Sequence, residues 1–487
     1  MTIDDFENTS IEKAARIMKT TSILTVIVAV FALFAAPDSK SETKPNIIFI
    51  LADDLGYGDL SCYGQKKFTT PNIDRLASEG LKFTQFYSGS TVCAPSRDSL
   101  MTGYHTGRGV IRGNREHPET QGNWPIVPET VTVAKVMKKA GYTTGAFGKW
   151  GLGGHLSDGA AFKQGFDLFF GHYDQREAHT HYPPHLYRNE HRIELDGKTY
   201  SHDLFEKEAL DFIRTNKDRH FFCFMPILIP HAAMQVPEEF AAPWRVKFPE
   251  FEETIGRYTF DTEVRNPVAA FPGMMNRLDL TVKRIIDLLQ ELGLDDNTII
   301  MFSSDNGTHI EAGHRSDLFK SSGPLRGTKR DLYEGGIRVP MLVRWPGTVN
   351  PGTVSEHLGA FWDVLPTFAE LAGVEPSEYP DDINGLSFLP TILGNTESQK
   401  QHSYLYWEFF EQGGKIAARW GDWKGVQLNV HQNFGRPDAP IEVYNLSADI
   451  GETHNVSVER PDIVKKFREI FREARVSSPL FRFRAED

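Results

Sequence analysis

Two pairs of polar residues, each directly after an apolar run of the chain, could hold a metal ion. Asp53 and Asp54 follow one such run, and Asp305 and Asn306 follow another. Three carboxylates and an amide oxygen suit a hard cation such as Ca²⁺ or Mg²⁺, and neighbouring carboxylates repel one another unless a cation compensates them. An isolated Asp-Asp is more often a turn. The position of both pairs at the ends of apolar runs favours a metal site.

The sequence Cys93-Ala94-Pro95-Ser96-Arg97 is the sharpest chemical signal. Pro95 suits the first turn of a helix, so Cys93 is expected at the helix N-terminus, where free N–H groups and the helix dipole favour an anion. A thiol at such a position is expected to have a depressed pKa. A plain cysteine nucleophile is therefore one interpretation, although no thiol-protease signature surrounds the motif.

Two further polar residues also follow apolar runs. Lys149 comes after the run 143–147, and His231 comes after 220–225. Ligands of open α/β sheets bind in the crevice at the carboxyl ends of the strands. We therefore expect both residues to converge with the acidic pairs on one site.

The elements that must position these groups follow an α/β pattern. Apolar runs alternate with helical patterns, which indicates a sheet flanked by helices. The predicted strands are 46–52, 143–147, 220–225 and 298–302, and the predicted helices are 132–140 and 277–292. The pattern of apolar and polar residues changes after about residue 394. There we predict short antiparallel strands at 404–410, 416–420, 423–428 and 442–445 and an amphipathic helix at 461–474. The expected domains are a catalytic domain at 45–397 and a C-terminal sheet-plus-helix subdomain at 398–487.

The composition is that of an ordinary globular protein. The chain has 487 residues, of which 40% are hydrophobic and 24% charged, and this excludes a disordered chain, a coiled coil or a multi-span membrane protein. A net charge of −12 argues against nucleic acid as a partner, because phosphate neutralisation needs a basic surface. It does not argue against an anionic substrate, since a few cations in a pocket suffice.

The N-terminal region predicts export. The apolar stretch 23–36 is shorter than the roughly 20 residues that span a bilayer, so it fits the hydrophobic region of a signal peptide within a leader at 1–40. We expect a periplasmic or secreted protein with no stable membrane span, and an uncleaved anchor is the alternative. Three cysteines leave at least one unpaired, and Cys62 and Cys223 either pair or lie buried as free thiols.

Several motifs, in order along 45–480, resemble the formylglycine-dependent sulfatases. They are 45–56 with 70–74, the motif 93–97, Gly148-Lys149-Trp150, Pro230-His231, Ser304-Asp305-Asn306-Gly307 and 333–340. The resemblance implies an alkaline-phosphatase-like fold, a large mixed sheet flanked by helices. It also implies that a separate formylglycine-generating enzyme recognises the Cys-x-Pro-Ser-Arg motif and oxidises Cys93 to formylglycine. The hydrated aldehyde then has two hydroxyls, one to attack sulfur and one to expel sulfate later.

The same resemblance assigns roles to the polar residues. It implies Ca²⁺ bound by Asp53, Asp54, Asp305, Asn306 and an oxygen of modified residue 93. Asp305 and the metal would activate the attacking hydroxyl, and Arg97 would orient it. Lys149 and Lys329 would bind sulfate oxygens and neutralise developing charge. His231, with an ordinary pKa near 6.5, would protonate the leaving oxygen.

One position departs from the family pattern. The family commonly has Gly-Lys-Trp-His, where the histidine assists the second hydroxyl, whereas this chain has Gly151 at that place. Either another base reaches the site or the step runs with less help. The candidates nearby in the sequence are His155, His179 and His181.

The segments 175–183, 305–309 and 323–331 are similar to those of carbohydrate sulfatases that act on galactose or N-acetylgalactosamine sulfates of carrageenan-like galactans or glycosaminoglycans. Arg176, His179, His181 and His309 are the candidate substrate-binding residues. Imidazoles and a guanidinium can hydrogen-bond sugar hydroxyls, and such bonds discriminate epimers. The alternative is that the histidines brace loops. We expect exo-acting desulfation of a galacto-configured saccharide.

Three other functions compete with this hypothesis. The first is an arylsulfatase of broad specificity. The second is a phosphonate or phosphate ester hydrolase, because one fold hosts both chemistries. The third is a glycan-binding protein without turnover, in which Cys93 would remain unmodified.

Overall fold

The computed structural model describes residues 44–118 and 122–484. The predicted leader at 1–40, with its apolar stretch, lies outside these described residues. Among the helices that are described, none is long and apolar enough to cross a membrane.

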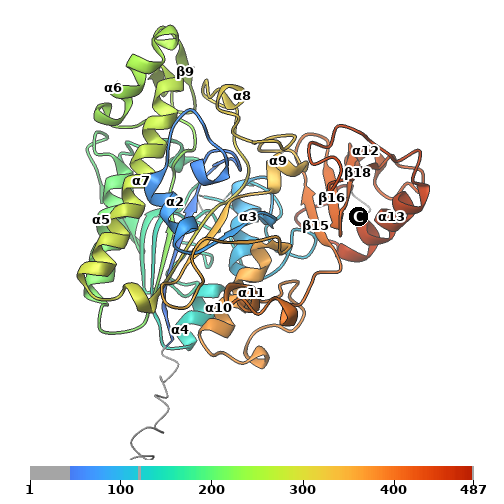
Figure 1. Cartoon of the computed structure of the whole chain (residues 1–487), viewed down its shortest axis with the longest axis horizontal. Coiled ribbons are helices and arrows are strands. Elements are labelled where there is room, and N and C mark those ends of the chain that lie inside the picture. Colours follow the sequence, from blue (N-terminus) through green and yellow to red (C-terminus); the bar gives the residue numbers. More distant parts are fainter. Residues whose placement is uncertain (1–43, 119–121, 485–487) are drawn as a thin grey trace, which may run out of the picture. The chain divides into compact units, whose positions relative to one another are not determined.

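A ten-stranded mixed sheet forms the centre of the described chain (Figure 1). Its order is β13-β2-β12-β11-β1-β8-β4-β5-β6-β7. The middle strands are parallel: β11 (Thr298–Ser304), β1 (Asn46–Ala52), β8 (Phe221–Pro226), β4 (Thr143–Lys149) and β5 (Leu168–His172). The outer strands are β13 (Thr353–Ser355), β2 (Leu81–Phe83), β12 (Met341–Arg344), β6 (His185–Arg188) and β7 (His191–Glu194). The predicted large mixed sheet is confirmed.

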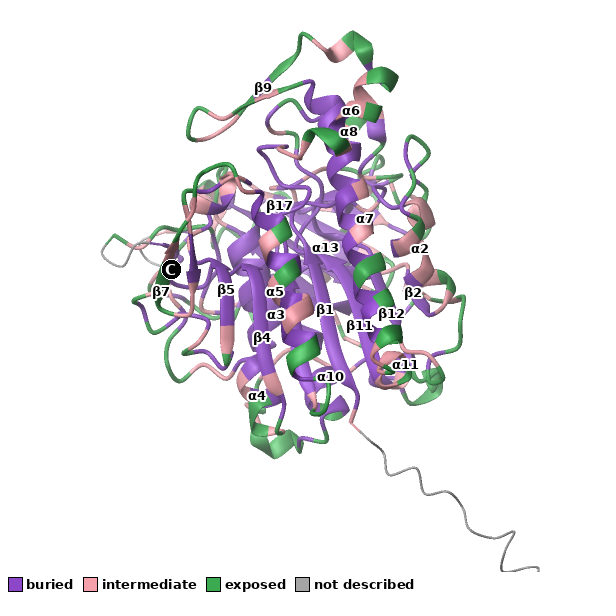
Figure 2. Cartoon of the chain, turned by 90° about the vertical axis from the view of Figure 1, so that its left-hand side faces the viewer, coloured by how far each residue is buried: buried purple, intermediate pink, exposed green. Residues whose placement is uncertain are grey.

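Helices cover both faces of this sheet because the buried strands are apolar on both sides. Alternate residues of β1 belong to two cores: Phe49 packs in one and Ile50 in the other. One face carries α2 (Pro71–Ser78), α5 (Ser201–Thr215) and α7 (Pro267–Glu291), and the other carries α3 (Cys93–Thr102), α4 (Val133–Lys139) and α10 (Val364–Leu371). Figure 2 shows the buried strands beneath partly exposed helices. The expected flanking helices are confirmed.

The structure adds short elements that the sequence patterns did not predict. They include β3 (Phe86–Tyr87), β9 (Ile255–Arg257), β10 (Glu263–Arg265), β14 (Gly359–Ala360), α6 (Glu238–Lys247), α8 (Ser316–Phe319), α9 (Glu334–Ile337), α11 (Leu389–Ile392) and α12 (Val430–Asn433). The helices α2, α5 and α10 and the sheet strands β2, β5, β6, β7, β12 and β13 were not predicted individually either. Helix α7 also begins at Pro267, well before the predicted start at 277. Its N-terminus is set by Asn266, whose side chain accepts a hydrogen bond from the Ala269 N–H.

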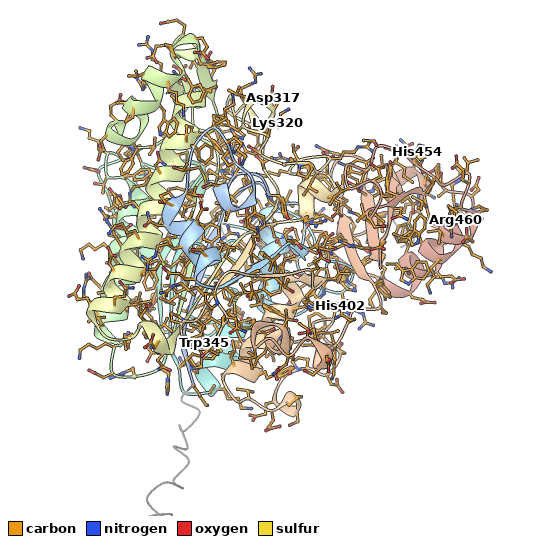
Figure 3. The ribbon with its side chains drawn as sticks, viewed as in Figure 1. Asp317, Lys320, Trp345, His402, His454 and Arg460 are labelled. Atoms are coloured by element: carbon orange, nitrogen blue, oxygen red, sulfur yellow. The ribbon has the colours of Figure 1, made fainter. Side chains whose placement is uncertain are left out.

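A small antiparallel sheet follows near the C-terminus, as predicted. It consists of β15 (Leu405–Phe409), β16 (Lys415–Trp420), β17 (Trp423–Leu428) and β18 (Glu442–Asn445), and α13 (Pro461–Ala474) packs on one face through Phe467. Lys424 of this sheet is fully buried, with Nζ 2.8 Å from Oε1 of Glu334. The segment before β15 contains His402, which Figure 3 labels. Its Nε2 lies 2.8 Å from Oδ1 of Asp363 and so ties this segment to the residues before α10.

Cys62 and Cys223 do not pair, so the pairing alternative is wrong. Both are free thiols, Cys223 buried within β8 and Cys62 half-buried. Burial raises the pKa of both thiols above the ordinary value, which makes them unreactive packing residues.

Candidate active site

The two acidic pairs meet at the carboxyl ends of neighbouring strands. Asp53 and Asp54 follow β1, and Asp305 and Asn306 follow β11, which pairs with β1 in parallel. The Asp54 N–H donates to Oδ1 of Asp305 at 3.1 Å, and Nδ2 of Asn306 donates to Oδ1 of Asp54 at 2.7 Å. All four side chains are buried. The predicted convergence is present in the structure.

Cys93 is the first residue of α3, and Arg97 lies one turn later on the same helix. The Cys93 Sγ lies 3.5 Å from Oδ1 of Asp53. Arg97 joins the two strand ends, with Nη2 2.7 Å from Oδ2 of Asp305 and 3.3 Å from Oδ2 of Asp53. Its Nη1 donates to the carbonyl of Lys149 at 2.5 Å. The helix therefore places the thiol and a fixed guanidinium on the same cluster of carboxylates.

Two lysines complete the charge balance of this cluster. Lys149, the last residue of β4, places Nζ 2.7 Å from Oδ2 of Asp53 and 3.4 Å from the Cys93 Sγ. Lys329 places Nζ 2.7 Å from Oδ2 of Asp54 and 3.3 Å from Nε2 of His231. Two ammonium groups thus lie on the aspartate pair beside the thiol and could both contact one anionic group of a substrate.

The donor set fits a metal ion. Asp53, Asp54, Cys93 and His231 each offer a ligand atom, and these atoms lie within 4.8 Å of one another. Oδ1 of Asn306 is buried and has no hydrogen-bond partner among the described residues, so a cation would satisfy it. Burial opposes ionisation of Asp53, but Lys149 and other nearby cations outweigh it and hold its pKa below the ordinary value. An ionised carboxylate is the form that binds a hard cation.

The expected low pKa of the Cys93 thiol is wrong. The thiol is only 1% exposed, and burial together with the charge of Asp53 raises its pKa well above the ordinary value, although Lys149 opposes this. The rise in the thiol pKa caused by desolvation outweighs the lowering expected from the helix N-terminus. The unmodified thiol is therefore a poor nucleophile, which argues against the plain cysteine mechanism.

The expected pKa of His231 near 6.5 is also wrong. Burial and the charge of Lys329 lower it well below that value. Burial would lower the pKa of Lys329 as well, but Asp54 outweighs this effect and raises it. Lys329 is therefore charged and donates to a neutral imidazole.

The remaining candidate residues lie at different depths. The ring of His179 stacks on that of His231 at 5.1 Å, and the ring of His309 lies 6.3 Å from it, so both adjoin the site. His181 lies behind it, with Nε2 3.2 Å from the His231 carbonyl. Arg176 is exposed farther out, over the ring of Phe260. The sequence does not predict how far each of these residues lies from the reacting centre, because the packing of loops determines that distance.

The space above Gly151 is occupied by Gln175. A Cβ atom at position 151 would lie 2.5 Å from Nε2 of Gln175, and this nitrogen is buried without a hydrogen-bond partner among the described residues. His155, one of the expected substitutes, instead stacks on Tyr187 at 4.5 Å. Gln175 begins the segment 175–183 that resembles carbohydrate sulfatases, but it was not a candidate site residue, because a glutamine has no basic group that would suggest this position.

Three more residues reach the site without a sequence signal. Tyr258 and Thr259, which follow β9, contact His179: the rings of Tyr258 and His179 are 5.0 Å apart, and Oγ1 of Thr259 lies 3.0 Å from Nδ1 of His179. Glu311 lies 3.5 Å from Lys329 and 2.8 Å from Arg330. These groups come from loops far apart in sequence, which local patterns do not bring together.

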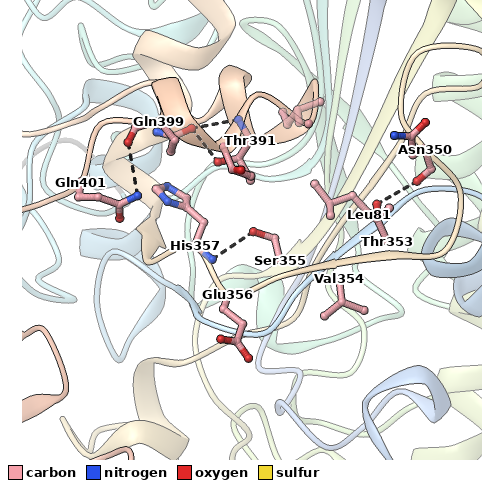
Figure 4. Close-up of a pocket in the computed structure, with 13 residues that line it drawn as sticks. Leu81, Asn350, Thr353, Val354, Ser355, Glu356, His357, Thr391, Gln399 and Gln401 are labelled. Atoms are coloured by element: carbon pink, nitrogen blue, oxygen red, sulfur yellow. Dashed lines mark hydrogen bonds between the residues drawn. The ribbon is translucent and has the colours of Figure 1, made fainter.

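A small pocket of about 170 Å³ opens beside the first turn of α3. Asn114, Gln175, His179 and Thr259 are among its lining residues. Oδ1 of Asn114 accepts the N–H of Ala94 at 2.9 Å, which places this pocket next to residue 93. A separate hollow of about 560 Å³, lined by Ser355, His357 and Gln399 among others, contains none of the predicted site residues (Figure 4).

Buried Asp98, one residue after Arg97, makes the stability of the fold depend on pH. Burial raises its pKa to about 7. The folded state therefore retains a proton that the unfolded chain loses near pH 4, and this stabilisation disappears as pH rises through about 7. Asp98→Asn should raise the melting temperature relative to the wild type by more at pH 8 than at pH 5. Calorimetry at both pH values measures this, and an equal difference at the two would contradict it.

Comparison with known proteins agrees with this geometry. The sulfatase family model matches residues 45–374, and the model described as "N-sulphoglucosamine sulphohydrolase, C-terminal" matches residues 327–476. The first match contains every candidate site residue.

Individual relatives cover most of the chain. N-acetylgalactosamine-6-sulfatase of Rattus norvegicus is 31% identical, and the alignment covers 88% of this chain and 84% of the rat protein. Arylsulfatase A of Homo sapiens is 32% identical, and the alignment covers 88% of this chain and 87% of the human protein. The solved structure of Ps i-CgsB in complex with k-i-k-neocarrahexaose superposes with a TM-score of 0.74 at 28% identity, over 89% of this chain and 93% of that one.

Proposed function

Because this chain belongs to the sulfatase family and is a sulfuric ester hydrolase, we propose that it removes sulfate from a saccharide that carries galactose or N-acetylgalactosamine sulfate. The observation that carries the proposal is the position of Cys93, whose thiol contacts Asp53 and the ammonium of Lys149, while Lys329 binds the adjacent Asp54. The saccharides named for the relatives support the substrate class. We assign catalysis to a domain at 45–397, followed by the subdomain at 398–487.

The proposal includes conversion of Cys93 to formylglycine by a separate maturation enzyme, after export directed by the leader at 1–40. Formylglycine would supply the oxygen nucleophile, and Ca²⁺ would activate it and neutralise substrate charge. Asp53, Asp54, Asp305 and Asn306 would hold the cation. Arg97 fixes two of these carboxylates through its bonds to Asp53 and Asp305, so it sets the geometry of the cluster.

Lys149 and Lys329 bind the sulfate group in this proposal. Each ammonium is already aimed at the centre of the cluster by an aspartate, so little reorganisation is needed when an anion arrives. Negative charge bound there lies beside His231 and raises its pKa, because an opposite charge favours the imidazolium form. His231 then donates a proton to the leaving sugar oxygen, a contribution typically of about 10²–10⁴ in rate.

The substrate class is tested with matched sulfated oligosaccharides of the galactose and glucose series. We expect faster sulfate release from the galacto series and weak activity on simple aryl sulfates, since hydrogen bonds to the sugar select its configuration. Ion chromatography of released sulfate measures both. Equal release from the two series would contradict the sugar assignment, and a preferred aryl sulfate would favour a broad arylsulfatase.

A phosphonate or phosphate ester hydrolase is the second candidate, because the fold hosts both chemistries. A dianionic phosphate would also meet Lys149 and Lys329. Turnover of an aryl sulfate and an aryl phosphonate by the same preparation separates the two functions, and we expect kcat/KM to be higher for the sulfate.

A further inference from the structure

A second, larger cleft continues from the small pocket beside residue 93. Its volume is about 810 Å³, within the range of about 300–1,000 Å³ usual for ligand sites. Glu116, Asp174 and Arg176 line both cavities, so the two lie side by side. A substrate held by its sulfate at the cluster can therefore extend into this cleft.

The tip of the β9–β10 hairpin forms one wall of the cleft and is fixed to the active site. Thr259 bonds to His179, and the hydroxyl of Tyr258 lies 3.3 Å from Oε2 of Glu311. The next residue, Phe260, lines the larger cleft. Tyr258 and Thr259 thus contact the active site, and the next residue, Phe260, contacts the cleft.

Phe260 is held in an unusual conformation that exposes its ring. Its φ is +58° and that of Asp261 is +52°, in the left-handed region that bulky residues avoid. The side chain is 55% exposed although it is a large apolar group. Strained, exposed residues of this kind persist most often at ligand sites.

Arg176 lies next to this ring, and its charge is not paired with a carboxylate of the described residues. Its guanidinium carbon is 5.6 Å from the centre of the Phe260 ring. It forms no ion pair within the described ranges, whereas the other arginine of the cleft, Arg192, pairs with Glu194 at 3.0 Å. The cleft therefore offers an apolar ring beside a guanidinium that makes no ion pair, although the carboxylates of Glu116, Asp174 and Glu177 also line the cleft.

We propose that Phe260 and Arg176 form a subsite for the saccharide unit adjacent to the one that loses its sulfate. The ring of Phe260 packs against the C–H face of that pyranose, and Arg176 binds an acidic substituent on it, a sulfate or a carboxylate. This inference rests on the proposed function. It makes the enzyme selective for acidic oligosaccharides over sulfated monosaccharides.

The test compares a sulfated monosaccharide with two disaccharides that carry the same reactive unit, one with an acidic neighbour and one with a neutral neighbour. Phe260→Ala should lower kcat/KM about 3- to 10-fold for both disaccharides and leave the monosaccharide unchanged. Phe260→Tyr should restore the loss. Arg176→Gln should affect only the acidic disaccharide. Ile255→Ala, an exposed apolar position on the same hairpin, is the matched control and should change none of the three.

Calorimetric binding in a Cys93→Ala background provides a readout that does not depend on turnover. There, Phe260→Ala should weaken binding of the disaccharides but not of the monosaccharide. Equal losses for monosaccharide and disaccharides would show that Phe260 acts only on the fold, and would overturn the subsite. Failure of the matured wild type to release sulfate from any ester would instead contradict the proposed function, while the binding comparison still decides the subsite.

Discussion

Cys93→Ala should abolish sulfate release while leaving the fold intact. Loss of the nucleophile lowers turnover by a factor on the order of 10⁶ in a serine protease. The thiol is buried and has only the weak contacts to Asp53 and Lys149, so its loss removes little packing. Sulfate release, melting temperature and binding of a sulfated ligand are measured together. Substantial residual activity would show that the nucleophile lies elsewhere.

Cys93→Ser is the sharper control of this prediction. A serine oxygen can accept the sulfuryl group but cannot expel it afterwards, so the variant should accumulate a covalent sulfate adduct instead of turning over. Intact mass spectrometry detects the adduct. The same measurement on the mature wild type should show a mass about 18 Da below that of the unmodified chain, because the thiol is replaced by an aldehyde. An unmodified mass in fully active protein would contradict the formylglycine assignment.

The sequence predicted the parts of the site that lie on regular elements. Asp53, Lys149 and Asp305 stand at or just after the ends of buried parallel strands, and apolar runs reveal such strands directly. Cys93 is the first residue of α3, a helix that the sequence marks with Pro95 in its first turn and Gly103 at its C-terminal end. At these positions local sequence determines tertiary placement, because parallel strands bring their carboxyl ends together.

The remainder depends on burial and on loops, which local patterns do not encode. The pKa values expected for Cys93 and His231 were wrong because both groups are desolvated by residues far away in sequence. Gln175 above Gly151 and the hairpin residues Tyr258 and Phe260 were missed because no periodicity indicates where a loop packs. These are the residues that would determine specificity.

Asp54→Asn should remove the bound metal ion and most of the activity. The carboxylate accepts hydrogen bonds from Lys329 and Asn306, and its backbone φ of +63° is one that asparagine tolerates, so the fold should survive. A neutral amide cannot compensate a divalent cation, and we expect turnover to fall by a factor of about 10² or more, in the range seen for loss of one electrostatic contact in a transition state. Elemental analysis of the purified variant and the wild type measures the metal directly.

Asp59→Asn is the matched control for this variant. Asp59 is buried in the loop after the metal-binding pair, its Oδ2 accepts the Gly56 N–H at 2.8 Å, and burial raises its pKa to about 7. Because a carboxyl with a pKa of about 7 carries a proton in about half of the molecules at neutral pH, and the Asn amide oxygen can still accept the Gly56 N–H, the amide should replace it without loss of metal. A stoichiometric Ca²⁺ content in Asp59→Asn but not in Asp54→Asn would locate the ion at the ends of β1 and β11. Undiminished activity in wild-type protein that chelation has freed of metal would rule the site out.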